Sequence, residues 1–172
     1  MPLSPTGVNE TLASAATFAF FFCPAFQSAV YASTPSLPWP RADLPTSNRL
    51  EAGVPVYRYL YAGNFSNISP EQFLGAYHAA ELPLLFGTFD DFRGSGTDFE
   101  RATSIGMQDA WLALATGGVA GIEQTGWPRY TNISTGLVRE FGAQSFNGTR
   151  QVVNDISVEE FDASCSQFDQ SV

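Results

Sequence analysis

The segment VPVYRYLY, residues 54–61, most restricts how this chain can fold. Its β-branched and aromatic residues occupy both faces of an extended strand, and Arg58 is its one charged residue. A strand that is apolar on both faces is usually buried on both sides inside a parallel sheet. Two further runs, 136–141 and 150–153, have strand character. The sequence predicts a mixed α/β fold with about one central strand. That is too little sheet for a doubly wound domain, so we expect neighbouring strands from elsewhere.

Helix signals flank this strand. Residues 9–32 read as a helix that is interrupted or ended near Pro24, and residues 33–53 hold four of the eleven prolines, which favours a surface connection. After the strand, Ser69 at an N-cap position and Pro70 at the first helical position predict a helix start. We find no internal repeat and no low-complexity linker.

Two capping boxes predict further helices. Thr97-Asp98-Phe99-Glu100 opens a helix that we expect to end at Gly117-Gly118. Its apolar stripe follows helical spacing at Met107, Ala110, Trp111 and Leu114. Ser157-Val158-Glu159-Glu160 opens a short last helix that carries Cys165.

Composition narrows the function classes. The chain has 172 residues, of which 44% are hydrophobic and 15 are Phe. This composition predicts a folded chain with a hydrophobic core and not a disordered one. Its net charge is −9, and all eight basic residues are Arg. Binding to nucleic acid or to anionic lipid through a basic surface is therefore disfavoured. Any catalysis that needs an imidazole must use His78, the single histidine.

Glycosylation signals and cysteine spacing point to a secreted protein. Five of seven Asn residues stand in Asn-x-Ser/Thr, where chance predicts about one, and we expect N-glycosylation at two or more of them. These are Asn9, Asn64, Asn67, Asn132 and Asn147. Cys23 and Cys165 lack the close spacing of zinc or redox motifs. One bridge between them would close a loop of about 140 residues, worth about 4 kcal/mol. Two buried free thiols are the alternative.

The apolar stretch 12–30 does not look like a signal peptide or a membrane span. No basic residue precedes it, Glu10 stands where a positive region would be expected, and Pro24 interrupts it. We therefore predict a buried helix and no transmembrane segment. Because a secreted protein needs a signal peptide, we expect that peptide on a missing N-terminal part.

His78 is the main catalytic candidate. It follows the central strand, and loops at the carboxyl ends of parallel strands commonly carry catalytic groups. An imidazole there can act as a general base, because it takes and returns a proton near neutral pH. A packed, hydrogen-bonded histidine beside Tyr77 is the structural alternative. His78-x-x-Glu81 lacks the further ligands that a metal site requires, so we expect Glu81 to anchor the turn by hydrogen bonding.

No nucleophile motif accompanies His78. The G-x-S-x-G elbow of α/β-hydrolases is absent, and Ala102-Thr103-Ser104-Ile105-Gly106 lies inside a capped helix where a strained elbow cannot form. We therefore predict a structural role for Ser104. The Gly-rich run 92–99 lacks Lys and reads as a turn before a helix, not as a phosphate-binding loop.

Four segments in order resemble type B carboxylesterases, the cholinesterase-like branch of the α/β-hydrolases. GAYHAAELPLLFG is similar to the segment that carries the family's catalytic histidine. Its matching positions are Gly75, His78, Glu81, Leu82, Phe86 and Gly87. The other segments are a Cys-Pro helix at 22–25, a late helix at 107–118 and a Trp-Pro-x-Tyr turn at 126–130. Together they cover nearly the whole chain, and fungal secreted members are the most similar.

The resemblance implies that residues 1–172 are the C-terminal part of an α/β-hydrolase fold, an incomplete central sheet with flanking helices. It also implies a Ser-His-Glu or Ser-His-Asp triad to which this chain contributes only His78. The family's serine and acid precede the Cys-Pro helix, its Gly-Gly oxyanion loop is absent from this chain, and Glu10 does not fit the acid position. In some members the Cys-Pro cysteine pairs with one near the C-terminus, which agrees with a Cys23–Cys165 bridge.

The sequence therefore favours part of a secreted carboxylesterase or lipase that acts on small-molecule or lipid esters, without a cofactor or metal. By itself the chain is expected to be inactive, because it lacks the nucleophile and the acid. A non-catalytic cholinesterase-like binding or adhesion glycoprotein module is one alternative. A self-contained glycoprotein domain is another, and it would unfold cooperatively, whereas a fragment would be molten.

Overall fold

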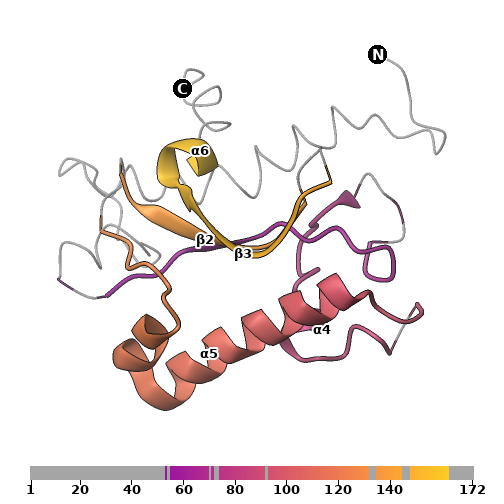
Figure 1. Cartoon of the computed structure of the whole chain (residues 1–172), viewed down its shortest axis with the longest axis horizontal. Helices are drawn as coiled ribbons and strands as arrows, with labels where there is room; N and C mark the ends of the chain where they lie inside the picture. The colour runs from indigo at the N-terminus through magenta and orange to yellow at the C-terminus, as the bar shows by residue number, and fades with distance from the viewer. Residues whose placement is uncertain are drawn as a thin grey trace, which may run out of the picture. The chain divides into compact units, whose positions relative to one another are not determined.

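The structure of the protein, a computed structural model, describes residues 53, 55–69, 71, 74–91, 93–131, 135–144 and 148–162. Within these ranges the elements are β1 (Tyr59–Tyr61), α4 (Leu82–Leu85), α5 (Asp98–Gln124), β2 (Leu137–Gln144), β3 (Arg150–Ser157) and α6 (Val158–Asp162) (Figure 1). The chain divides into two compact units. One unit contains Tyr57–Tyr130 and Leu137–Ile156, and therefore both His78 and the hydrophobic core, whereas α6 belongs to the other.

The three strands form one sheet in the order β1-β2-β3. β1 runs parallel to β2, with Tyr59 opposite Arg139 and Tyr61 opposite Phe141. β2 and β3 are joined by the short connection 145–149, and so short a connection can only join antiparallel neighbours. The predicted strand runs 136–141 and 150–153 are confirmed, and both extend further. Among the described residues the sheet therefore has one central strand as expected, but that strand is β2 and not the segment 54–61.

Strand β1, which the sequence predicts as a central strand buried on both faces, is shorter and more exposed than predicted. Of residues 54–61 only Tyr59–Tyr61 form a strand, and the side chain of Tyr59 is 40% exposed. Within the described part of the chain β1 is an edge strand, with β2 as its one neighbour. The parallel pairing predicted for this strand is confirmed, but its burial on both faces was wrong for this reason.

Helix α5 begins as predicted. The Thr97 hydroxyl accepts a hydrogen bond from Glu100 N at 3.1 Å, and the Glu100 carboxylate accepts one from Thr97 N at 3.3 Å. This reciprocal capping box satisfies two amides at the exposed end of the helix. Of the predicted apolar stripe, Met107 and Ala110 are buried and Trp111 packs against the core, whereas Leu114 is 43% exposed.

The far end of α5 differs from the prediction. At Gly118 the backbone takes φ 58° and ψ −141°, which breaks the helix without ending it, because helical geometry resumes and continues to Gln124. A Cβ atom at Gly121 would lie 2.1 Å from the carbonyl oxygen of Ala113. The two glycines thus have separate roles: Gly118 permits the change of direction, and Gly121 permits the close approach that follows.

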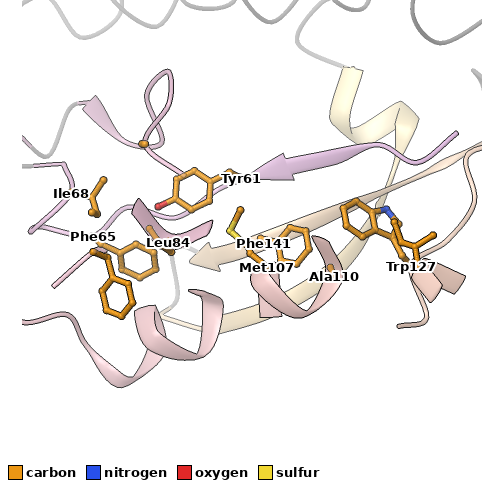
Figure 2. Close-up of a cluster of buried hydrophobic side chains, with 11 residues drawn as sticks. Tyr61, Phe65, Ile68, Leu84, Met107, Ala110, Trp127 and Phe141 are labelled. Carbon is orange, nitrogen blue, oxygen red and sulfur yellow. The ribbon is translucent and has the colours of Figure 1, made fainter. Parts of the chain in front are cut away.

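The hydrophobic core lies between α5 and strands β1 and β2. Figure 2 shows it as a row of side chains that extends from Ile68 and Phe65 at one end to Trp127 at the other. The buried members are Tyr61, Phe65, Ile68, Ala80, Leu84, Phe89, Met107, Ala110, Ile122, Trp127 and Phe141. Because Ala80 and Leu84 belong to this core, the segment that carries His78 is attached to it on its C-terminal side.

One end of the core is closed by a tightly bonded group that we call the Trp127 corner, formed by Arg58, Trp127, Tyr130, Arg139 and Asp155. The indole nitrogen of Trp127 donates to Arg58 O at 3.2 Å. Arg139 makes a two-pronged ion pair with Asp155, at 2.8 and 3.0 Å, and donates to Gly126 O at 2.6 Å. Its guanidinium lies 5.7 Å from the centre of a Trp127 ring. The charge of this buried arginine is thus matched on several sides.

The last described helix, α6, also has its predicted cap, because the Ser157 hydroxyl accepts from Glu160 N at 3.1 Å. Cys23, Cys165 and the helix predicted at 9–32 lie outside the described residues. No helix in the described ranges has both the length and the apolar character needed to cross a membrane.

Candidate functional site

His78 lies where the sequence predicts it, on an exposed loop between β1 and α4. β1 is parallel to β2, and the chain leaves it at Tyr61, its carboxyl end. This is the side of an α/β sheet at which side chains of different loops can meet around a substrate. Because His78 is exposed at this position, it is the candidate for proton transfer in the described part of the chain.

The backbone around His78 forms two consecutive turns. Ala80 N donates to Tyr77 O at 3.0 Å, and Leu82 N donates to Ala79 O at 3.2 Å. Ala79 has a positive φ of 65°, a conformation that is unfavourable for a residue with a Cβ atom. Glu81 anchors the start of α4 through its backbone, since its carbonyl accepts from Leu84 N and Leu85 N. Its side chain does not cap the helix.

Helix α4 is fixed to α5 by Ser104. The Ser104 hydroxyl donates to Leu84 O at 2.6 Å, and Gln108 Nε2 donates both to Leu84 O at 3.1 Å and to the Ser104 hydroxyl at 2.8 Å. Ser104 is fully buried, so it is not available as a nucleophile. The structural role predicted for Ser104 is confirmed, and that role is to hold the segment that follows His78.

A second attachment precedes His78, and the sequence did not reveal it. The Ser69 hydroxyl donates to Gly75 O at 2.6 Å, and the Tyr77 hydroxyl donates to Ile68 O at 3.1 Å. Ser69 was expected to cap a helix instead. Pro70 and Gln72 lie outside the described residues, so that helix start stays a prediction. The Ser-Pro-Glu-Gln pattern is a local signal for a helix start. The bond from Ser69 to Gly75 O depends instead on the path of the following residues, which bring Gly75 back beside Ser69.

A buried polar pair lies beneath the loops. Glu100 and Tyr61 are both buried, and in the described structure neither Glu100 Oε1 nor the Tyr61 hydroxyl has a hydrogen-bond partner. Burial raises the pKa of Glu100, although hydrogen bonds from Asn67 and Thr97 oppose the rise. Burial, and then the charges of Glu100 and Glu81, raise the pKa of Tyr61. Both groups are therefore held toward their neutral forms.

The two described glycosylation motifs differ in exposure. Asn64 is exposed. Asn67 is 6% exposed, and its amide nitrogen donates to Phe89 O at 3.0 Å. A glycan on that nitrogen would have to displace this bond and open the core. Asn9, Asn132 and Asn147 lie outside the described residues.

The described residues contain no cluster of three or more His, Cys, Asp or Glu that could hold a metal ion. Glu81 instead lies close enough to Tyr59 for its charge, after burial, to raise the pKa of that hydroxyl. The chemistry that the described site offers is that of one exposed imidazole on a loop attached at both ends.

Two curated fungal proteins match part of the chain. Secreted lipase 5 of Gibberella zeae is 56% identical over 84 residues, which make up 49% of this chain and 16% of the lipase. Chlorogenic acid esterase of Aspergillus niger is 52% identical over 67 residues, or 39% of this chain and 13% of the esterase. The matched segments thus span less than a fifth of either relative. The chain matches no protein-family model. These similarities support a carboxylesterase or lipase family.

Proposed function

We propose that the chain is the C-terminal portion of a secreted carboxylic ester hydrolase and that His78 is its catalytic base. The observation that carries this proposal is the exposed imidazole on the loop after parallel strand β1, in a chain similar to a lipase and an esterase. The substrate class is a carboxylic ester of a small molecule or a lipid. The nucleophilic serine and the triad acid would come from residues outside this chain.

In this reaction His78 transfers protons between oxygen atoms. Its imidazole nitrogen takes the proton of the serine hydroxyl as the serine oxygen bonds to the ester carbonyl carbon. The resulting imidazolium gives that proton to the departing alcohol oxygen, which leaves an acyl-enzyme. His78 then takes a proton from water as the water oxygen bonds to the acyl carbonyl carbon. The bond between that carbon and the serine oxygen breaks, the carboxylic acid leaves, and the His78 imidazolium returns the proton to the serine oxygen. Each step needs an accessible imidazole held in one orientation.

The test is hydrolysis of a p-nitrophenyl ester by two proteins. One is the 172-residue chain, and the other is a longer protein that also includes the residues encoded before Met1. We expect sustained hydrolysis by the longer protein and none by the chain alone, since loss of triad members costs about 10⁴-fold to 10⁶-fold in rate. Hydrolysis by the chain alone, or none by the longer protein, would contradict the proposal.

Secretion would be accompanied by two modifications. We propose a disulfide between Cys23 and Cys165, and thiol titration of the denatured, unreduced protein should find no free thiol. We also propose N-glycosylation at exposed motifs. Of the two described motifs, Asn64 is the better acceptor because the Asn67 amide is buried and bonded. Mass spectrometry of protein secreted from a fungal host should find a glycan on Asn64 and an unmodified Asn67. The opposite occupancy would contradict this assignment.

A further inference from the structure

The loop that carries His78 is held by its ends more than by its own packing. Between Gly75 and Glu81 the only buried residue is Ala80. Ala79, directly after His78, has a positive φ of 65°. A residue with a Cβ atom keeps this conformation only where its surroundings impose it. The backbone conformation beside His78 is therefore imposed in part by contacts made elsewhere in the loop.

Two side-chain hydroxyls supply those contacts on the N-terminal side. Ser69 is 3% exposed, and its hydroxyl donates to Gly75 O at 2.6 Å. The Tyr77 hydroxyl donates to Ile68 O at 3.1 Å. One bond ends three residues before His78 and the other begins at the residue beside it. Together they join the His78 loop to the turn formed by residues 65–69.

That turn is itself a firm support. Ile68 N and Ser69 N both donate to Phe65 O, at 3.0 and 2.6 Å. Arg93 donates to Ile68 O at 3.0 Å, so this carbonyl accepts from Arg93 and Tyr77 together. Phe65 and Ile68 belong to the hydrophobic core. A side chain bonded to this turn is therefore bonded to a turn that is anchored in the hydrophobic core.

We propose that Ser69 and Tyr77 are positioning residues that fix the orientation of the His78 imidazole. This inference rests on the proposed function only in giving that orientation a catalytic purpose. Neither hydroxyl takes or gives a proton in the reaction. They restrict the loop so that the imidazole stays within reach of the serine, and displacement of a catalytic group by about 1 Å can cost about 10²-fold in rate.

The chain offers matched controls for both hydroxyls. The Thr116 hydroxyl donates to Leu112 O at 2.8 Å at an exposed position of α5, so Thr116→Val is the control for Ser69→Ala. The Tyr57 hydroxyl donates to the Glu123 carboxylate at 3.2 Å, also at an exposed position, so Tyr57→Phe is the control for Tyr77→Phe. Each control removes one hydroxyl bond of the same unit without touching the His78 loop.

Nuclear magnetic resonance tests the positioning itself in the longer protein, in which the His78 imidazole signals are those that His78→Gln removes. We expect one dispersed set of His78 imidazole signals in the unmodified longer protein. Ser69→Ala and Tyr77→Phe should move or split that set, while both controls leave it in place. The proposal is overturned if the two variants leave the His78 signals unmoved. It is equally overturned if the unmodified signals coincide with those of the urea-unfolded protein.

Kinetics of the longer esterase test the catalytic consequence. We expect Ser69→Ala and Tyr77→Phe to lower kcat by about 10-fold to 100-fold with KM within twofold, and both controls to leave kcat unchanged. A rise in KM at constant kcat would contradict positioning. If the longer protein hydrolyses no ester, the proposed function fails, whereas the imidazole signals still decide whether Ser69 and Tyr77 orient His78.

Discussion

The His78 loop and the Trp127 corner occupy the same unit but are built in opposite ways. In the corner, Trp127 and Tyr130 are 5% and 1% exposed, and Arg139 is bonded to Asp155 and to two backbone carbonyls. In the loop, His78 is exposed and Ala79 holds an unfavourable backbone conformation. The corner fixes the fold and presents no reactive group, whereas the loop presents one and contributes little packing.

The difference teaches where to look for function in such a domain. Reactive groups are often placed on loops that a rigid scaffold positions, because a group that must meet substrate cannot also be buried. The ion pair of Arg139 and Asp155 takes part in several hydrogen bonds. Its donors and acceptors are used in holding strands β2 and β3 and the turn at 125–127 together. The many bonds of the Trp127 corner stabilise the fold, and the exposed His78 is the candidate for chemistry.

The largest structural effect should come from the corner. Trp127→Ala removes an indole that contacts Trp111 and Phe141 at ring-centre distances of 5.3 and 5.4 Å, together with the hydrogen bond to Arg58 O. We expect a loss of about 3–5 kcal/mol in the free energy of unfolding. Urea unfolding followed by far-ultraviolet circular dichroism measures it. A loss under about 1 kcal/mol would mean that the corner does not stabilise the unit.

The second largest effect on the free energy of unfolding should come from the part of α5 around its break. There we expect substitution of Gly121 to destabilise the fold and substitution of Gly117 not to. At Gly121 a Cβ atom would overlap the Ala113 carbonyl at 2.1 Å, so Gly121→Ala should cost about 1–3 kcal/mol. Gly117 has no atom within 4 Å of its added Cβ and no positive φ, so Gly117→Ala should stabilise by up to about 1 kcal/mol. Thermal unfolding compares the two, and equal effects would contradict the close approach at Gly121.

A smaller effect concerns the buried carboxyl group beneath the loops. Because the pKa of Glu100 is raised in the folded state, the folded state binds this proton more tightly than the unfolded state does. The wild type therefore loses stability as pH rises through the raised pKa. We expect Glu100→Gln to gain stability relative to wild type as pH rises from about pH 4, near the pKa of an unfolded Glu, toward neutral pH.

Asp90 supplies the control of opposite sign. A hydrogen bond from Gly96 N, and then the bond from Arg101, lower the pKa of Asp90. Its contribution is therefore present above the unfolded pKa and is lost as pH falls. Asp90→Asn should therefore lose stability relative to wild type as pH rises toward about pH 4, the pKa of an unfolded Asp, and should show little further change above it. Urea unfolding at the two ends of each pH range measures both variants. A pH trend of the same sign in both would contradict the contrast between the buried and the exposed carboxyl group.

Local sequence signals correctly predicted the starts of two helices, the loop position of His78 and the structural role of Ser104. The capping boxes at Thr97 and Ser157 open helices α5 and α6 because both partners of each cap lie within one helical turn. The loop position of His78 followed from the strand before it. The structural role of Ser104 followed from the capped helix around it, and its partner Leu84 O could not be known.

The misread features depend on residues distant in sequence. Gly117-Gly118 was expected to end the helix, whereas the helix breaks at Gly118 and then resumes, with Gly121 close to the carbonyl of Ala113. The uncovered face of Tyr59 depends on which strands lie beside β1. The bonds of Ser69 and Tyr77 likewise join the loop to a turn that precedes it. Such contacts are set by tertiary packing and not by local preference.

The central claim is that His78 carries chemistry and little stability. The most direct test is His78→Gln in the longer ester hydrolase, with kcat/KM for a p-nitrophenyl ester and the free energy of unfolding measured on the same preparation. We predict a loss of about 10⁴-fold or more in kcat/KM, with stability changed by less than about 0.5 kcal/mol. A variant that keeps its activity, or one that loses it only because it unfolds, would contradict the claim.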